Sequence, residues 1–191
     1  MAQLGTGAFG MDIGRLRDET PGTKRVTHFH NCGASLMPQP VIDAVVDHLH
    51  LEAEIGGYEA EAVAASKVDH TYDAIARMLN CHRSEVALVE NATVAWDMAF
   101  YGMRFRRGDV VLTAVSEYAS NFIAFLQRAQ RDGIVVRVVP NDAHGQVSVS
   151  ALASMIDDTV QLIAITHIPC NVGLVNPAAA ICFGRCELVR I

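Results

Sequence analysis

The turn Glu90-Asn91-Ala92-Thr93 joins a short apolar run, residues 86–89, to a segment with helical character. A helix that begins here leaves its first N–H groups free and its positive dipole end exposed, and Thr93 adds a hydroxyl. That combination suits a phosphate group. Asn91 or Thr93 could equally be an ordinary N-cap. On local sequence alone the cap is favoured, because caps are common and ligand sites are few.

The sequence contains neither the glycine-rich dinucleotide fingerprint nor the phosphate-binding loop of nucleoside triphosphatases. Both of these ligand classes are therefore disfavoured.

Two later loops carry polar groups at the expected ends of strands. In residues 116–122, Tyr118 could stack on a flat ring and Asn121 could cap a helix; an ordinary surface turn explains them as well. In residues 166–177, His167, Cys170 and Asn171 lie in a loop shaped by proline and glycine. The spacing of Cys170 and His167 indicates nucleophilic catalysis only weakly, and a packed loop with a buried thiol explains it too.

A fourth polar stretch, residues 28–38, contains His28 and His30 in alternation. Without carboxylate partners the pair does not support a metal site, and a strand edge is the favoured explanation. Asn31 and Gly33 are typical turn residues. The five cysteines complete no four-ligand zinc set, so we expect no metal.

The bulk composition limits the partners. The chain has 191 residues, 51% hydrophobic and 19% charged, with a net charge of -6. This composition suits a globular domain and disfavours nucleic acid and anionic membranes as partners. No stretch reaches the length of a membrane span and no secretory signal is evident, so reduced thiols and a cytoplasmic location are expected.

The elements that must position these loops follow from periodicity. Helices are expected at 41–49 and at 58–79, the latter with Asn80 as its stop and a buried face. That face comprises Ala62, Ala65, Val68, Tyr72, Ile75 and Leu79.

After residue 80, continuous Val- and Ile-rich runs alternate with helical segments about every 25 residues, which predicts parallel strands buried on both faces. The strands are expected at 85–89, 109–114, 134–139 and 160–166, and the helices at 93–103, 121–131 and 148–156. The expected fold is α/β, a mainly parallel sheet with helices on both faces.

The stretches NCGASLMP, GGYEAE, ENATVAWDMAF, SEYASN and HIPCNVGLVNPAAA, in this order, resemble the class V aminotransferases. These are pyridoxal-phosphate enzymes of fold type I that include the cysteine desulfurases and isopenicillin N epimerase-like proteins. The resemblance covers residues 28–181, as part of the large domain of such an enzyme. It leaves residues 1–27 as an N-terminal arm and residues 182–191 as a short divergent tail.

The resemblance implies roles for individual residues. Ala92 and Thr93 match the turn that holds the cofactor phosphate. Tyr118 falls where many desulfurases have a histidine stacked on the pyridine ring of the cofactor. Asn171 matches the asparagine that approaches the ring hydroxyl of the cofactor. Asn31 and Ala34 fall at positions that line the substrate side of the active site in this family. A small amino-acid substrate and a homodimer are also implied.

The chain departs from the family at two essential positions. The family's aspartate for the pyridine nitrogen and its lysine for the Schiff base lie beyond the matched stretches. The two lysines present, Lys24 and Lys67, match neither. We therefore expect no catalytic residue, no covalent cofactor attachment and no activity from this apparently truncated chain alone. Cys170 receives no catalytic role, and the reaction type stays open.

Two alternatives remain from the sequence. One is a non-catalytic binding or interaction fragment, and the other is a small α/β domain that uses the Thr93 turn for another phosphate ligand.

Overall fold

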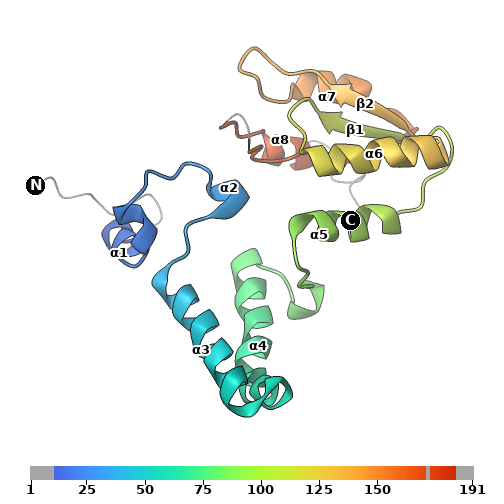
Figure 1. The fold of residues 1–191 in the computed structure, drawn as a ribbon. Coiled ribbons are helices and arrows are strands. Elements are labelled where there is room, and N and C mark those ends of the chain that lie inside the picture. The colour runs from blue at the N-terminus through green and yellow to red at the C-terminus, as the bar shows by residue number, and fades with distance from the viewer. Residues whose placement is uncertain (1–10, 171–172, 184–191) are drawn as a thin grey trace, which may run out of the picture. The chain divides into compact units, whose positions relative to one another are not determined.

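The computed structural model describes residues 11–170 and 173–183 of the chain, which divides into two compact units, Met1–Leu88 and Val89–Ile191 (Figure 1). Residues 184–191, and with them most of the expected divergent tail, lie outside the described residues.

The regular elements in the described part of the first unit are all helices. Its two long helices, α3 and α4, confirm the helices expected at 41–49 and 58–79, and a glycine separates them. Gly56 takes a φ of 94°, a backbone conformation that favours glycine, and Asn80 ends α4 in the left-handed conformation as expected. The elements of this unit are α1 (Ile13–Asp18), η1 (Pro21–Lys24), α2 (Asn31–Ala34), α3 (Gln39–Ile55), α4 (Gly57–Leu79) and η2 (Arg83–Glu85).

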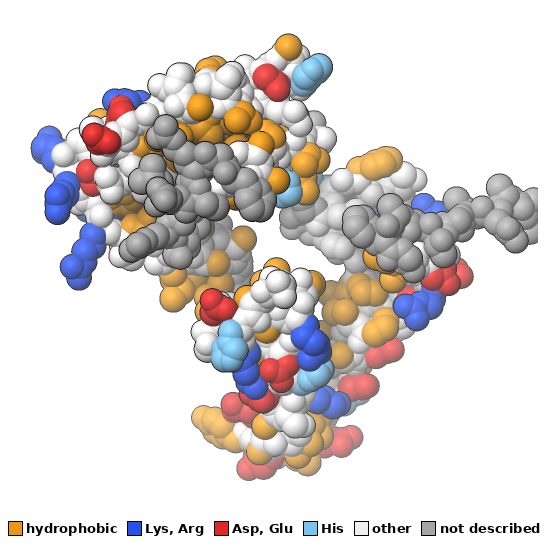
Figure 2. Space-filling view, turned by 180° about the vertical axis from the view of Figure 1, so that it is seen from behind, with side chains coloured by type: hydrophobic (Ala, Val, Ile, Leu, Met, Phe, Trp, Pro, Cys, Tyr) orange, Lys and Arg blue, Asp and Glu red, His pale blue; other side chains and the backbone are white. Residues whose placement is uncertain are grey.

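The expected buried face of the 58–79 helix is wrong for this chain. Only Ala60 and Ala76 of α4 are buried. Of the six residues expected inside, Tyr72 and Ile75 are half-buried, while Ala62, Ala65, Val68 and Leu79 are exposed. Periodicity identified an apolar face, but a two-helix hairpin has no third layer to cover it. Apolar side chains therefore lie at the surface among charged ones (Figure 2).

The second unit contains a parallel sheet of three strands in the order β2-β1-β3. Val110 of β1 lies opposite Val135 on one side and Val160 on the other. The expected α/β fold is confirmed, as are the three helices between residues 93 and 156. The elements are α5 (Ala92–Gly102), β1 (Val110–Ala114), α6 (Ala119–Asp132), β2 (Val135–Val139), α7 (Val149–Met155), β3 (Val160–Ala164) and α8 (Ala178–Phe183).

The central strand β1 is buried along its whole length, as expected for a continuous apolar run in a parallel sheet. Because successive strand residues point to opposite faces, β1 contributes to two cores. Val111 packs in a cluster with Phe100 of α5 and Phe125 of α6. Val110, Leu112 and Ala114 belong to the other cluster, with Leu152 of α7 and with Ile181 of α8 packed against it. Helices therefore cover both faces of the sheet.

The strand expected at 85–89 does not form. Residues 83–85 are the helix η2, and Val86 is extended (φ −100°, ψ 126°) but belongs to no ladder. An apolar run becomes a strand only when another strand pairs with it. Within residues 11–170 and 173–183, no helix has both the length and the apolar character needed to cross a membrane.

Candidate functional site

The start of α5 has both a side-chain cap and backbone N–H groups without an acceptor in the helix. Asn91 is the N-cap, because its Oδ1 accepts a hydrogen bond from the N–H of Val94 at 3.0 Å. The local preference for a cap is thus confirmed at Asn91. The N–H groups of Ala92 and Thr93, in the first turn, have no intrahelical acceptor, and both residues are exposed. The helix start is consequently capped and still able to donate.

Thr93 connects this turn to the start of α6. Its hydroxyl donates to Ser120 Oγ at 3.3 Å, although the two residues are 27 apart in sequence. Ser120 lies in the first turn of α6. The N-terminal ends of α5 and α6, each with a partial positive charge, therefore lie next to each other. The Ser120 hydroxyl, which accepts the Thr93 bond and keeps its own hydrogen, and the free N–H groups of α5 are available there to a negatively charged group.

Tyr118 is the N-cap residue of α6, two positions before Ser120. It is 52% exposed, so its ring is not consumed by packing on the sheet. The exposed ring is open to stacking, and an ordinary surface turn explains its position as well. The structure brings Thr93 and Tyr118 to neighbouring turns at the same edge of the sheet.

Glu117 was not singled out by the sequence analysis. Its carboxylate accepts hydrogen bonds from four donors, three side chains and one backbone N–H. The sequence feature that could have indicated its role is a carboxylate directly before a helix N-cap and four residues before Asn121. The donors are Thr113 Oγ1 (3.4 Å), Tyr118 N (2.9 Å), Asn121 Nδ2 (2.9 Å) and Thr166 Oγ1 (2.5 Å).

The loop after β3 is held by a buried asparagine. Asn176 is 1% exposed; its Nδ2 donates to Thr166 O at 2.7 Å and its Oδ1 accepts from Val147 N at 3.0 Å. Its own N–H donates to His167 O at 2.8 Å. His167 is exposed and Cys170 is half-buried. Asn171, expected to face a ring hydroxyl, lies outside the described residues.

Asn31 and Ala34 begin and end the short helix α2 of the first unit, and both are exposed. The ring of His28 is 2.9 Å from Ala34 O through Nε2. The described residues contain no group of three or more His, Cys, Asp or Glu side chains that could hold a metal ion.

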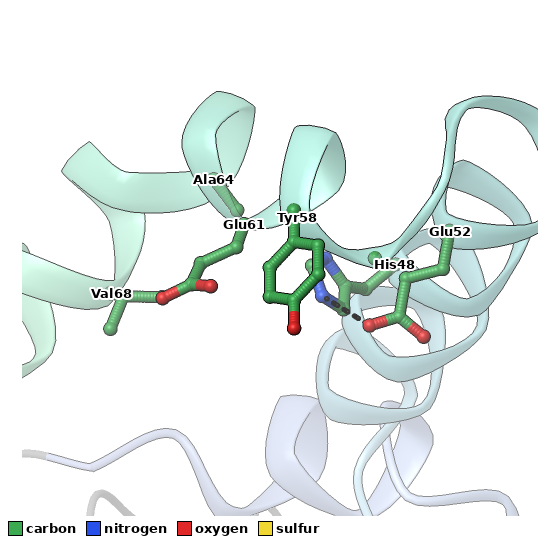
Figure 3. Close-up of a pocket in the computed structure, with 7 residues that line it drawn as sticks. His48, Glu52, Tyr58, Glu61, Ala64 and Val68 are labelled. Atoms are coloured by element: carbon green, nitrogen blue, oxygen red, sulfur yellow. Dashed lines mark ion pairs between the residues drawn. The ribbon is translucent and has the colours of Figure 1, made fainter.

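The first unit has a hollow of about 400 Å³ on the α3–α4 hairpin (Figure 3). His48 and Glu52 form a pair at 3.4 Å within it, and Tyr58 lies between His48 and Glu61 in this view. Its two carboxylates give the hollow a negative charge when His48 is neutral, which opposes an anionic ligand. The remaining lining residues are Gly57, Ala64 and Val68.

A second hollow in this unit, about 520 Å³, contains Arg77 and Arg83. Arg83 is already engaged by Asp69 at 2.5 Å and Asp73 at 3.3 Å. The hydrogen bond from Arg83, reinforced by its charge, lowers the pKa of Asp69. With Arg83 neutralised in this way, the second hollow is a poorer anion site than the paired helix ends of α5 and α6.

Comparisons with known proteins agree with this architecture. The family described as Aminotransferase class-V matches residues 27–184. A probable cysteine desulfurase of Methanothermobacter thermautotrophicus is 29% identical over 164 residues, which span 84% of this chain and 41% of that protein.

Solved structures show the same fold. The apo cysteine desulfurase of Thermococcus onnurineus NA1 superposes with a TM-score of 0.80 at 21% identity, over 92% of this chain and 45% of that one. A mutant of C-DES with glycine covalently linked to its PLP cofactor superposes with a TM-score of 0.78 at 23% identity, over 86% of this chain and 44% of that one.

The chain spans less than half the length of each of these relatives. Because the family match covers most of its residues, the chain belongs to the class-V aminotransferase family.

Proposed function

We propose that this chain binds pyridoxal phosphate non-covalently, with the phosphate at the paired N-terminal ends of α5 and α6. The observation that carries the proposal is the contact between Thr93 Oγ1 and Ser120 Oγ at 3.3 Å. It joins two positive helix ends and two hydroxyls in one place. C-DES, a relative by fold, carries this cofactor.

The residues present fit the cofactor's phosphate and ring. A phosphate requires several donors, which the Ala92 and Thr93 N–H groups and the Ser120 hydroxyl supply; the Thr93 hydroxyl becomes a further donor when it turns from Ser120 to the ligand. The nearby Glu117 would repel an anion, but its oxygens are occupied by four donors. The half-exposed ring of Tyr118 offers a flat apolar surface for stacking. Asn171 is proposed to approach the ring hydroxyl.

When bound, the cofactor supplies an electron sink for bonds at the α-carbon of an amino acid. The role of this chain's residues is to hold and orient it. We propose a small amino acid as the substrate class of the complete site, with Asn31 and Ala34 on the substrate side.

Covalent attachment and turnover are not expected from this chain alone. Attachment requires an amine, and neither lysine of the sequence, Lys24 or Lys67, matches the family's Schiff-base position; both belong to the first unit, whereas the strands belong to the second. Lys24 pairs with Asp18 at 3.7 Å, and Lys67 is exposed on α4. Borohydride treatment of the loaded chain followed by peptide mapping tests this; a stoichiometric label on either lysine contradicts it.

We further propose a cytoplasmic homodimer in which the exposed apolar face of α3 and α4 meets a second copy. Val45, Leu49 and Val63 are 51%, 58% and 65% exposed, which is a large apolar surface for a monomer. Sedimentation velocity of the wild-type chain should give a dimer, and Val63→Lys should shift it to monomer. A monomeric wild-type chain contradicts the dimer.

Calorimetry with pyridoxal phosphate, pyridoxal, inorganic phosphate and ADP tests the cofactor proposal. Pyridoxal phosphate should bind most tightly, and the double variant Thr93→Val/Ser120→Ala should weaken it by roughly 10- to 100-fold through two lost hydrogen bonds. Ser154→Ala, at an exposed position of α7, a helix that packs in the other core cluster than α5 and α6, is the control and should bind as wild type. Equal binding of ADP would favour a general phosphate-binding domain, and no binding by any ligand would favour an interaction fragment.

A further inference from the structure

We infer that Glu117 is a positioning residue that holds the loop after β1 and the loop after β3 in one fixed arrangement, so that Tyr118 faces the cofactor ring. The role in cofactor orientation rests on the proposed function. The linkage between the two loops does not, and it can be measured in the free chain.

The Glu117 carboxylate joins three elements. Thr113, fully buried in β1, and Asn121 in α6 donate to it from the two elements that flank its loop, at 3.4 Å and 2.9 Å. Thr166, just beyond β3 and 49 residues away in sequence, donates at 2.5 Å. Because β1 and β3 are parallel neighbours, their carboxyl ends lie at one edge, where a single side chain can reach both loops.

The chemistry of these donors explains why a carboxylate occupies the position. An ionised carboxylate only accepts hydrogen bonds and has about four acceptor positions, whereas an amide would direct an NH₂ group at neighbouring donors. All four partners are neutral donors, so the negative charge strengthens their bonds; the Thr166 bond is short at 2.5 Å, and the Thr113 contact at 3.4 Å is the longest of the four. The contacts with Thr113, Asn121 and Thr166 are partly buried, which limits competition from water.

The link to the site passes through the backbone of Tyr118. Its N–H donates to Glu117 Oε1 at 2.9 Å, which fixes the residue that starts α6 and hence the direction in which its ring leaves the chain. On the other side, Thr166 precedes His167, whose carbonyl is held by the Asn176 N–H at 2.8 Å. Glu117 therefore joins the Tyr118 loop to the loop that contains Cys170 and continues to Asn176.

Hydrogen–deuterium exchange of the free chain tests the linkage. Glu117→Ala should speed exchange of the Tyr118 amide and of the 166–170 segment by about tenfold, since it removes bonds to a charged acceptor. Thr166→Val should speed exchange in the 166–170 segment while the Tyr118 amide stays protected. Asp158→Asn, an exposed carboxylate in the turn before β3, should change neither.

The second measurement is the induced circular dichroism of bound pyridoxal phosphate. Glu117→Ala should reduce this signal and weaken binding by about tenfold, while Glu117→Gln, which keeps one acceptor oxygen, should restore part of both. A general loss of packing would instead lower protection throughout β1–β3.

The outcomes separate the two proposals. Failure of the wild-type chain to bind the cofactor contradicts the proposed function, and the exchange data still decide the linkage. If Glu117→Ala leaves exchange in the 166–170 segment unchanged, or binds with an unaltered dichroic signal, the positioning role is wrong.

Discussion

The two units of this chain use similar apolar residues with different results. In the second unit, Phe100, Phe125 and all five residues of β1 are buried. In the first unit, Ala60 and Ala76 are the buried apolar residues of the described segments, while Leu49 and Val63 remain exposed. A sheet covered on both faces encloses large side chains, whereas a single helical hairpin buries only small ones along its seam.

The consequence for function is a division of roles. A candidate phosphate site requires donors held in place, and the second unit provides them on a rigid sheet edge. The first unit offers an apolar surface whose stabilisation depends on what covers it. Four predictions test this contrast, in order of expected effect.

Truncation of the aromatic core should give the largest loss. Phe100 is fully buried, with ring centroids of Trp96 and Phe125 at 5.3 and 5.2 Å. Phe100→Ala should lower the free energy of unfolding by about 3–5 kcal/mol in urea titrations. Met78→Ala, in α4 where Met78 is 76% exposed, should change it by less than about 0.5 kcal/mol. Equal effects would remove the contrast between the units.

Asn176→Ala should cost about 2–3 kcal/mol in the same assay, because it leaves Val147 N and Thr166 O without their buried partner. Asn80→Gly is a comparison in the first unit. It keeps the left-handed helix end (φ 53°) and should be nearly neutral. An unchanged urea midpoint for Asn176→Ala would show that the buried asparagine does not stabilise the sheet.

Loss of a helix cap should lower the free energy of unfolding in the second unit but not in the first, and by less than the two changes above. Asn91 caps α5 and Asp12 caps α1, each accepting a backbone hydrogen bond at 3.0 Å. Asn91→Ala should cost about 1 kcal/mol, because α5 is packed in the cooperative unit. Asp12→Ala should leave the main unfolding transition unchanged, since α1 has no buried residue. A shift of that transition by Asp12→Ala would show that α1 is coupled to the sheet.

Loss of the ion pair between Arg83 and Asp69 should have the smallest effect on stability. Arg83 lowers the pKa of Asp69 in the folded chain, so the pair stabilises the fold above the ordinary aspartate pKa and ceases to do so as pH falls through the lowered value. In Arg83→Gln, NMR titration should show the Asp69 pKa moving upward. Added salt should reduce the difference, because both side chains are largely exposed. An unchanged Asp69 pKa would exclude Arg83 as the cause.

Much of the fold was predictable, because periodicity and stop signals are local. The helices at 58–79 and 121–131, the three formed strands and the stop at Asn80 follow from neighbouring residues alone. The strand expected at 85–89 was wrong because pairing depends on a distant partner. The buried face expected on α4 was wrong because burial depends on a covering layer.

Thr93 and Tyr118 were proposed from family motifs, and the structure places them on neighbouring turns. Glu117 was missed because its partners are scattered: Thr113 is four residues away, whereas Thr166 is 49 away. Nothing near Glu117 in the sequence indicates Thr166.

By itself the sequence determined the alternation of strands and helices, a helix cap at Asn91 or Thr93 and a chain with only two lysines, because each depends on residue identity or on neighbours within one turn. Tertiary structure decided that Thr93 meets Ser120 and that Glu117 meets Thr166. The physical reason is the parallel ladder. Its register brings the carboxyl ends of β1 and β3 to one edge, which no local pattern specifies.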